Sequence, residues 1–260
     1  MRVRAHLAVF AVAVGLVALH TWPLARDPGH LVPDNTDPWL FSWVMLSVFR
    51  NLLARPALLL HGSGFYPFGS SLTFAEPLLT PALVAGPLHA LTGNPWLAYN
   101  LTLVLFWAVS GWATYAVAYW ITRRHAAAAV AMLVFTVSRP RIEYAVEFQM
   151  EMLFGLPLGL YALARFVETQ RPRYLAACLA VLWLQAVAVW YVAVLLGFAL
   201  LVLALACVPR RWTGWRWRTL AWAAAGAVAL AAALAPVAWP YFVTRRELGL
   251  ERALGDALER

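Results

Sequence analysis

Long runs of apolar residues recur along the whole 260-residue chain, and they limit its possible folds more than any other feature. Hydrophobic residues make up 63% of the sequence and charged residues only 12%, with a mean hydropathy of +0.70. About 20 apolar residues in a helix cross a hydrocarbon core about 30 Å thick, and a helix satisfies its own backbone polar groups there. The sequence therefore predicts an all-α, polytopic transmembrane helical bundle.

We expect about seven spans in this bundle, at residues 6–22, 96–121, 126–138, 152–167, 174–189, 192–208 and 220–239. The apolar run 174–208 is too long for one crossing, so it is divided at Trp190 and Tyr191. The proline-rich run 77–92 is placed beside the membrane, because a crossing there would put Arg123 and Arg124 on the outside.

Arginine sets the expected orientation. The chain contains no lysine, its net charge is +8, and its arginines occur in pairs between the apolar runs, as topology signals do. Nucleic acid is therefore discounted as a partner. Arg2 and Arg4 precede the first span and place the N-terminus in the cytoplasm. A signal peptide could also begin this way, but no small-x-small cleavage site follows, so an uncleaved helix is favoured.

The longest polar stretch follows the first span and belongs to an extracytoplasmic loop at residues 24–95. In it, Asp34-Asn35-Thr36-Asp37-Pro38 is typical of a helix start, with Thr36 or Asp37 as the N-cap. An amphipathic helix is predicted at 39–53, with one face formed by Trp39, Trp43, Leu46 and Phe49.

Two regions are expected. The membrane core covers residues 1–240, including the loop at 24–95, and an extracytoplasmic amphipathic tail covers residues 241–260. The tail is charged and stops abruptly, which is also what a piece of a longer protein would show.

Most of the acidic residues fall on the extracytoplasmic side of this topology. A carboxylate in a partly dehydrated rim is costly unless it is paired or functional, and burial raises its pKa toward the range of a general base. Asp37 is the best candidate, because it lies at a helix N-terminus beside residues rich in Trp and Pro. The alternative is that Asp37 only caps its helix.

Arg139 and Arg141 directly follow an apolar span at the outer surface. Two guanidinium groups there can bind a phosphate of a lipid or diphosphate. The alternative is that these arginines extend to the membrane surface or pair with Glu143 and Glu147.

No cofactor or metal is expected. The six histidines and two cysteines lack metal-ligand spacing, and the chain has no phosphate-binding glycine loop and no dinucleotide fingerprint.

An ordered set of short motifs resembles the bacterial membrane proteins of the GT-C glycosyltransferase superfamily, in particular its mannosyl- and arabinosyltransferase-like group. The likeness covers nearly the whole chain. Its motifs are 34-DNTDPW-39, 65-FYPFG-69, 76-EPLL-79, 93-GNPWLAYNL-101, Ser110-Gly111, 138-SRPR-141, Gln149, 156-LPL-158 and Tyr191.

This resemblance implies an inverting transfer of sugar from a polyprenyl-phosphate donor to an extracytoplasmic acceptor, in the bacterial inner (plasma) membrane. It implies that Asp37 is the catalytic base, with Asp34 as the alternative. The positions that it implies for substrate binding are Glu76, Arg139, Arg141, Glu147, Gln149 and Tyr191.

Two departures from the family pattern weaken the resemblance. The family often has a histidine where this chain has Glu147, and a large soluble domain usually follows the membrane core. The alternatives are a non-catalytic transporter or flippase, and a degenerate fragment or assembly partner of an enzyme. A transporter is disfavoured because the predicted spans carry almost no charge near their centres.

Overall fold

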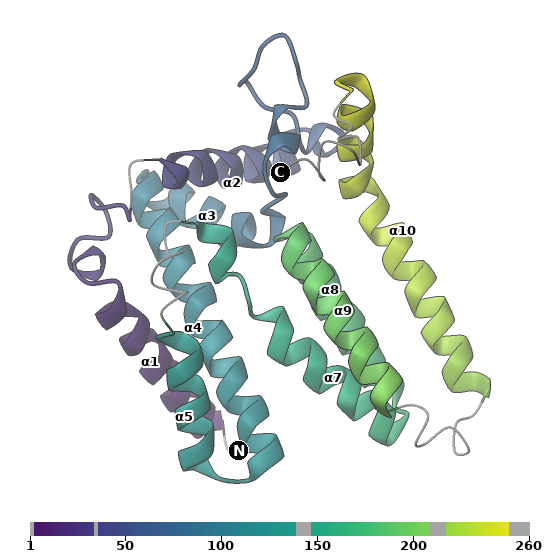
Figure 1. Cartoon of the computed structure of the whole chain (residues 1–260). Coiled ribbons are helices and arrows are strands. Elements are labelled where there is room, and N and C mark those ends of the chain that lie inside the picture. The colour runs from purple at the N-terminus through teal and green to yellow at the C-terminus, as the bar shows by residue number, and fades with distance from the viewer. Residues whose placement is uncertain (1–2, 34–35, 139–146, 208–216, 250–260) are drawn as a thin grey trace, which may run out of the picture.

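The computed structural model describes residues 3–33, 36–138, 147–207 and 217–249, and within these ranges it contains helices and no strand (Figure 1). The α-helices are α1 (Val3–His20), α2 (Asp37–Ala54), α3 (Leu79–Thr92), α4 (Pro95–Thr122), α5 (His125–Thr136), α7 (Gly155–Thr169), α8 (Pro172–Ala186), α9 (Trp190–Cys207) and α10 (Trp217–Glu247). Four 3-10 helices lie between them: η1 (Leu24–Arg26), η2 (Pro56–Leu58), η3 (Ser71–Phe74) and η4 (Phe148–Glu151).

Five helical segments within the described residues are long and apolar enough to cross a membrane. They are α1, α4, the segment Phe148–Thr169 that contains η4 and α7, α9 and α10. The predicted spans at 126–138 and 174–189 correspond to α5, with 12 residues, and α8, with 15. At 1.5 Å per residue these two helices are only about 18 and 22 Å long. The helical class of the bundle is confirmed, and seven crossings stay a prediction.

The long helices alternate in direction (Figure 1). The chain turns from α4 to α5 at Arg123 and from α7 to α8 at residues 170–171, and both turns lie at the same end of the bundle as the N-terminus. α4 packs against α1, α3, α5 and α7, so it is the central helix. Gly111 permits the close approach to α5, since a Cβ atom there would lie 2.4 Å from the Thr136 hydroxyl.

α2 lies across the other end of the bundle, over α3 and the start of α4 (Figure 1). The helix predicted at 39–53 is thus confirmed. The stripe that α2 buries has helical spacing and consists of Phe41, Val44, Met45 and Val48, whereas Trp39 is 57% exposed. α2 is apolar on more than one side, so spacing alone did not identify the side that α3 covers.

The run 174–208 is broken at residues 187–189, just before the predicted Trp190–Tyr191 position. There the backbone N–H groups of Leu78 and Leu79 donate hydrogen bonds to the carbonyls of Ala188 (3.1 Å) and Val187 (2.8 Å). The start of α3 therefore docks on the gap between α8 and α9.

α10 continues without a break through the predicted boundary at 240/241 and ends at Glu247. Most of the tail predicted at 241–260 lies outside the described residues.

Candidate functional site

Three segments that carry acidic residues lie at the end of the bundle that α2 covers (Figure 1). Asp37 begins α2, Glu76 precedes α3, and Glu147 precedes η4. Arg123 and Arg171 lie at the opposite end, in the turns after α4 and α7. The bundle thus places Asp37, Glu76 and Glu147 at one end and the turns with Arg123 and Arg171 at the other, while Arg50 of α2 and Arg245 near the end of α10 share the acidic end.

Asp37 occupies the first turn of α2, after Thr36 at the N-cap position. Its side chain is half-buried, and its carboxylate interacts electrostatically with the hydroxyl of Tyr99 in α4. Tyr99 is fully buried, and its ring lies 5.2 Å from the ring of Phe148 in η4. A carboxylate in the first turn of a helix interacts favourably with the positive end of the helix dipole.

Glu76 makes a structural hydrogen bond to the start of α9. One of its carboxylate oxygens accepts a hydrogen bond from the backbone N–H of Trp190, the first residue of α9, at 2.5 Å. Burial raises the pKa of the Glu76 carboxyl above its ordinary value, and the hydrogen bond from Trp190 opposes part of that rise. Glu76 therefore caps α9 across 114 residues of sequence.

Tyr191 and η4 complete the acidic end. The Tyr191 hydroxyl donates to the sulfur of Met150 at 2.6 Å and interacts electrostatically with Glu76, Glu147 and Glu151. Glu151 is fully buried. Glu76, Glu147 and Tyr191, three of the predicted binding residues, are thus brought together.

Gln149 lies in the same 3-10 turn as Met150 and Glu151. Its side-chain oxygen is buried and has no hydrogen-bond partner among the described residues, and the same holds for the Tyr99 hydroxyl. Buried polar atoms in proteins are almost always hydrogen-bonded to protein, water or a ligand.

Three predicted site residues lie outside the described residues: Asp34, Arg139 and Arg141. Their roles as alternative base and phosphate contacts stay predictions.

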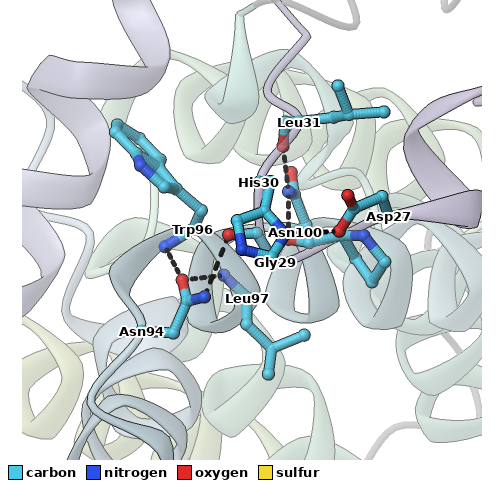
Figure 2. A network of polar contacts seen from close by, with 9 residues as sticks. Asp27, Gly29, His30, Leu31, Asn94, Trp96, Leu97 and Asn100 are labelled. Carbon is cyan, nitrogen blue, oxygen red and sulfur yellow. Dashed lines mark hydrogen bonds and ion pairs between the residues drawn. The ribbon is translucent and has the colours of Figure 1, made fainter.

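Two asparagines of α4 hold the loop that leads to Asp37 (Figure 2). Asn100 donates hydrogen bonds to the carbonyls of Pro28 (2.8 Å) and Leu31 (2.7 Å). Asn94 donates to the carbonyl of Gly29 at 2.9 Å, while its oxygen caps α4 by accepting from the N–H groups of Trp96 and Leu97.

These two positioning residues and Tyr99 were not predicted as site residues, although all three belong to the motif 93-GNPWLAYNL-101. The sequence signal that could have identified the two asparagines is their position near the start of the predicted span at 96–121. Tyr241 was missed as well. Its hydroxyl donates to the carbonyl of Ala75 at 2.9 Å, which joins α10 to the segment that carries Glu76.

Within the described residues, no group of three His, Cys, Asp or Glu side chains could hold a metal ion. No protein family model, no curated protein and no solved structure matches this chain.

Proposed function

We propose that this protein is an integral membrane glycosyltransferase, or the membrane core of one, that transfers a sugar from a polyprenyl-phosphate donor with inversion. The observation that carries the proposal is that Asp37, Glu147 and Tyr191 all lie at one end of a bundle of apolar helices. A donor whose phosphate lies at the membrane surface meets its catalyst at such an end.

Asp37 is the base of the proposed reaction. It takes the proton of the acceptor hydroxyl while the acceptor oxygen attacks the anomeric carbon of the sugar. The bond from that carbon to the donor phosphate breaks, and the phosphate leaves with the electron pair. Asp37 suits this role better than Glu76, because the Glu76 carboxylate already caps α9.

The other site residues have binding roles in this proposal. Gln149 is partly exposed, and the described residues leave its side-chain oxygen without a hydrogen bond, which a substrate hydroxyl would supply. Arg139 and Arg141 would stabilise the leaving phosphate.

A cavity of about 360 Å³ supports a lipid donor. It lies between the end of α1, α4 and the loop that Asn94 and Asn100 hold, and its apolar walls include Leu24, Leu31 and Leu103. Val32 and Pro33, which precede Asp37 closely in the sequence, also line the cavity, and in this proposal an isoprenoid chain held there brings its phosphate toward the base.

The proposal includes seven crossings, with α5 and α8 as short spans, an N-terminus in the cytoplasm and the site on the outer face of a bacterial plasma membrane. The arginine-bearing turns at Arg123 and Arg171 support this orientation through the positive-inside rule.

A transporter or flippase is the rival from another class. Such proteins usually carry ionisable residues near the middle of the membrane and place their site at broken helices. In the five candidate spans the ionisable residues lie near the ends, which favours the enzyme.

The test is to incubate the purified protein with radiolabelled polyprenyl-phosphate sugars and to measure donor turnover. We expect turnover by the wild type and a fall of about 10²- to 10⁴-fold in Asp37→Asn, the usual contribution of a general base. Asp27→Asn is the matched control, because Asp27 belongs to the same loop but pairs with His30 at 2.8 Å. Normal turnover in Asp37→Asn would remove Asp37 from the mechanism, and no turnover of any donor by the wild type would contradict the proposal.

A further inference from the structure

A second cavity lies toward the end of the bundle that has the Arg123 and Arg171 turns, away from the acidic site. It has a volume of about 340 Å³ and lies between α1, α4 and α7. The cavity is lined by four aromatic side chains, one histidine and one arginine: Trp112, Tyr119, Trp120, Tyr161, His6 and Arg123. No acidic side chain is among its described lining residues, so the cavity suits an anion.

The aromatic side chains that line this cavity are fixed by ring contacts and by a hydrogen bond next to them. Tyr119 stacks on His125 with ring centroids 4.4 Å apart, and Nδ1 of His125 lies 2.6 Å from the Tyr115 hydroxyl. Trp120 meets Tyr161 edge to face at 5.1 Å. A preorganised wall of this kind loses little conformational entropy when a ligand binds.

Arg123 supplies the charge. It ends α4 in the left-handed conformation, with φ at +57°, and its N–H donates a hydrogen bond to the carbonyl of Tyr119 at 2.8 Å. Glycine adopts this conformation with the least strain, yet an arginine occupies the position. Nδ1 of His6 is also buried, and it has no hydrogen-bond partner among the described residues.

An apolar cavity of about 300 Å³ lies next to the aromatic one, and Val117 lines both. Its walls include Ile121, Phe135 and Leu160. An arginine beside aromatic rings, next to an apolar cavity, matches a phosphate, a glycerol backbone and an acyl chain in that order.

We propose that this pair of cavities binds one phospholipid, with its phosphate on Arg123, its glycerol backbone among the aromatic rings and an acyl chain against Val117. This site is distinct from the acidic end and does not depend on the proposed glycosyl transfer.

The test is native mass spectrometry of the delipidated protein, titrated with phosphatidylglycerol and, separately, with inorganic phosphate. We expect one tightly retained lipid per chain. Arg123→Gly should weaken that binding by at least about tenfold, the usual effect of losing a charged hydrogen-bond partner. Glycine fits the left-handed helix end, so the fold should persist, which circular dichroism can check. Arg124→Gly is the matched control and should bind normally.

A second pair of variants tests whether the lipid needs the volume of the aromatic cavity, rather than the charge of Arg123. Ala116 lines the aromatic cavity, so Ala116→Phe should fill it and abolish the tight site, while Ala129→Phe on the exposed face of α5 should not. Equal loss in Arg123→Gly and Arg124→Gly, unchanged binding in Arg123→Gly or Ala116→Phe, or displacement of the lipid by equimolar inorganic phosphate would each overturn the proposal.

Discussion

Asn100 is only 1% exposed, and both hydrogen bonds that its amide nitrogen donates go to the backbone of the loop before Asp37. The sequence Asn100-Leu101-Thr102 matches a glycosylation signal, and the burial of Asn100 explains why a sugar could not be attached to it here. The amide instead fixes the position of a loop that has few apolar contacts of its own.

Replacing Asn100 should therefore release the loop. Asn100→Leu leaves the carbonyls of Pro28 and Leu31 without their donor, at a cost of roughly 2 to 4 kcal/mol. Thermal stability in detergent should fall accordingly. Thr102→Val is the control, since its hydroxyl bonds only to Ala98 within α4, and it should change stability far less. Equal effects of the two substitutions would contradict the positioning role of Asn100.

At the scale of elements, the contact between the start of α3 and the start of α9 organises the acidic end. Leu78 and Leu79 bond to the gap before α9, and Glu76 caps α9 through Trp190. The Tyr241 hydroxyl on α10 bonds to the adjacent Ala75. One short segment before α3 thus joins helices that are far apart in the sequence.

The pKa of Glu76 makes this contact sensitive to pH. Burial raises the pKa of Glu76 in the folded protein. The protonated Glu76 carboxyl therefore stabilises the fold fully below its ordinary pKa of 4.5, and this stabilisation is lost as the pH rises through its pKa in the folded protein. Glu76→Gln keeps an oxygen for the Trp190 N–H and should remove this loss. Glu76→Leu removes the cap and should destabilise the protein by about 1 kcal/mol. Unfolding measured from pH 4 to 8 checks both, and an unchanged pH profile in Glu76→Gln would refute the assignment.

The sequence predicted elements well where the signal is local. The helix start at 34–38 and the break near Trp190 follow from caps and length limits, and both agree with the structure. The buried face of α2 and the pairing of Glu76 with Trp190 depend on contacts between distant segments. Neither helical periodicity nor composition encodes such contacts, so they could not be predicted.

At the scale of the whole molecule, helices of alternating direction place the predicted acids at one end and the turns with Arg123 and Arg171 at the other (Figure 1). This arrangement agrees with the predicted topology in the order and direction of its helices. Helix length was predicted closely for the short helices α5 and α8, with 12 and 15 residues, whereas α10 extends well past the predicted span at 220–239.

Cysteine labelling in intact cells should measure the crossings. After Cys178 and Cys207 are replaced by alanine, we expect an impermeant thiol reagent to label His61→Cys and Ser138→Cys. Arg124→Cys should react only after the cells are opened. Labelling of Ser138→Cys on the same side as Arg124→Cys would show that α5 does not cross.

The hydrogen bond between Glu76 and Trp190 also bears on how the chain is made. A ribosome makes the segment before α3 long before it makes α9. Glu76 therefore has no α9 to cap until more than a hundred further residues have emerged. The early helices can enter the translocon one by one, while the proposed catalytic end assembles only near the close of synthesis. Activity would then report on complete membrane insertion.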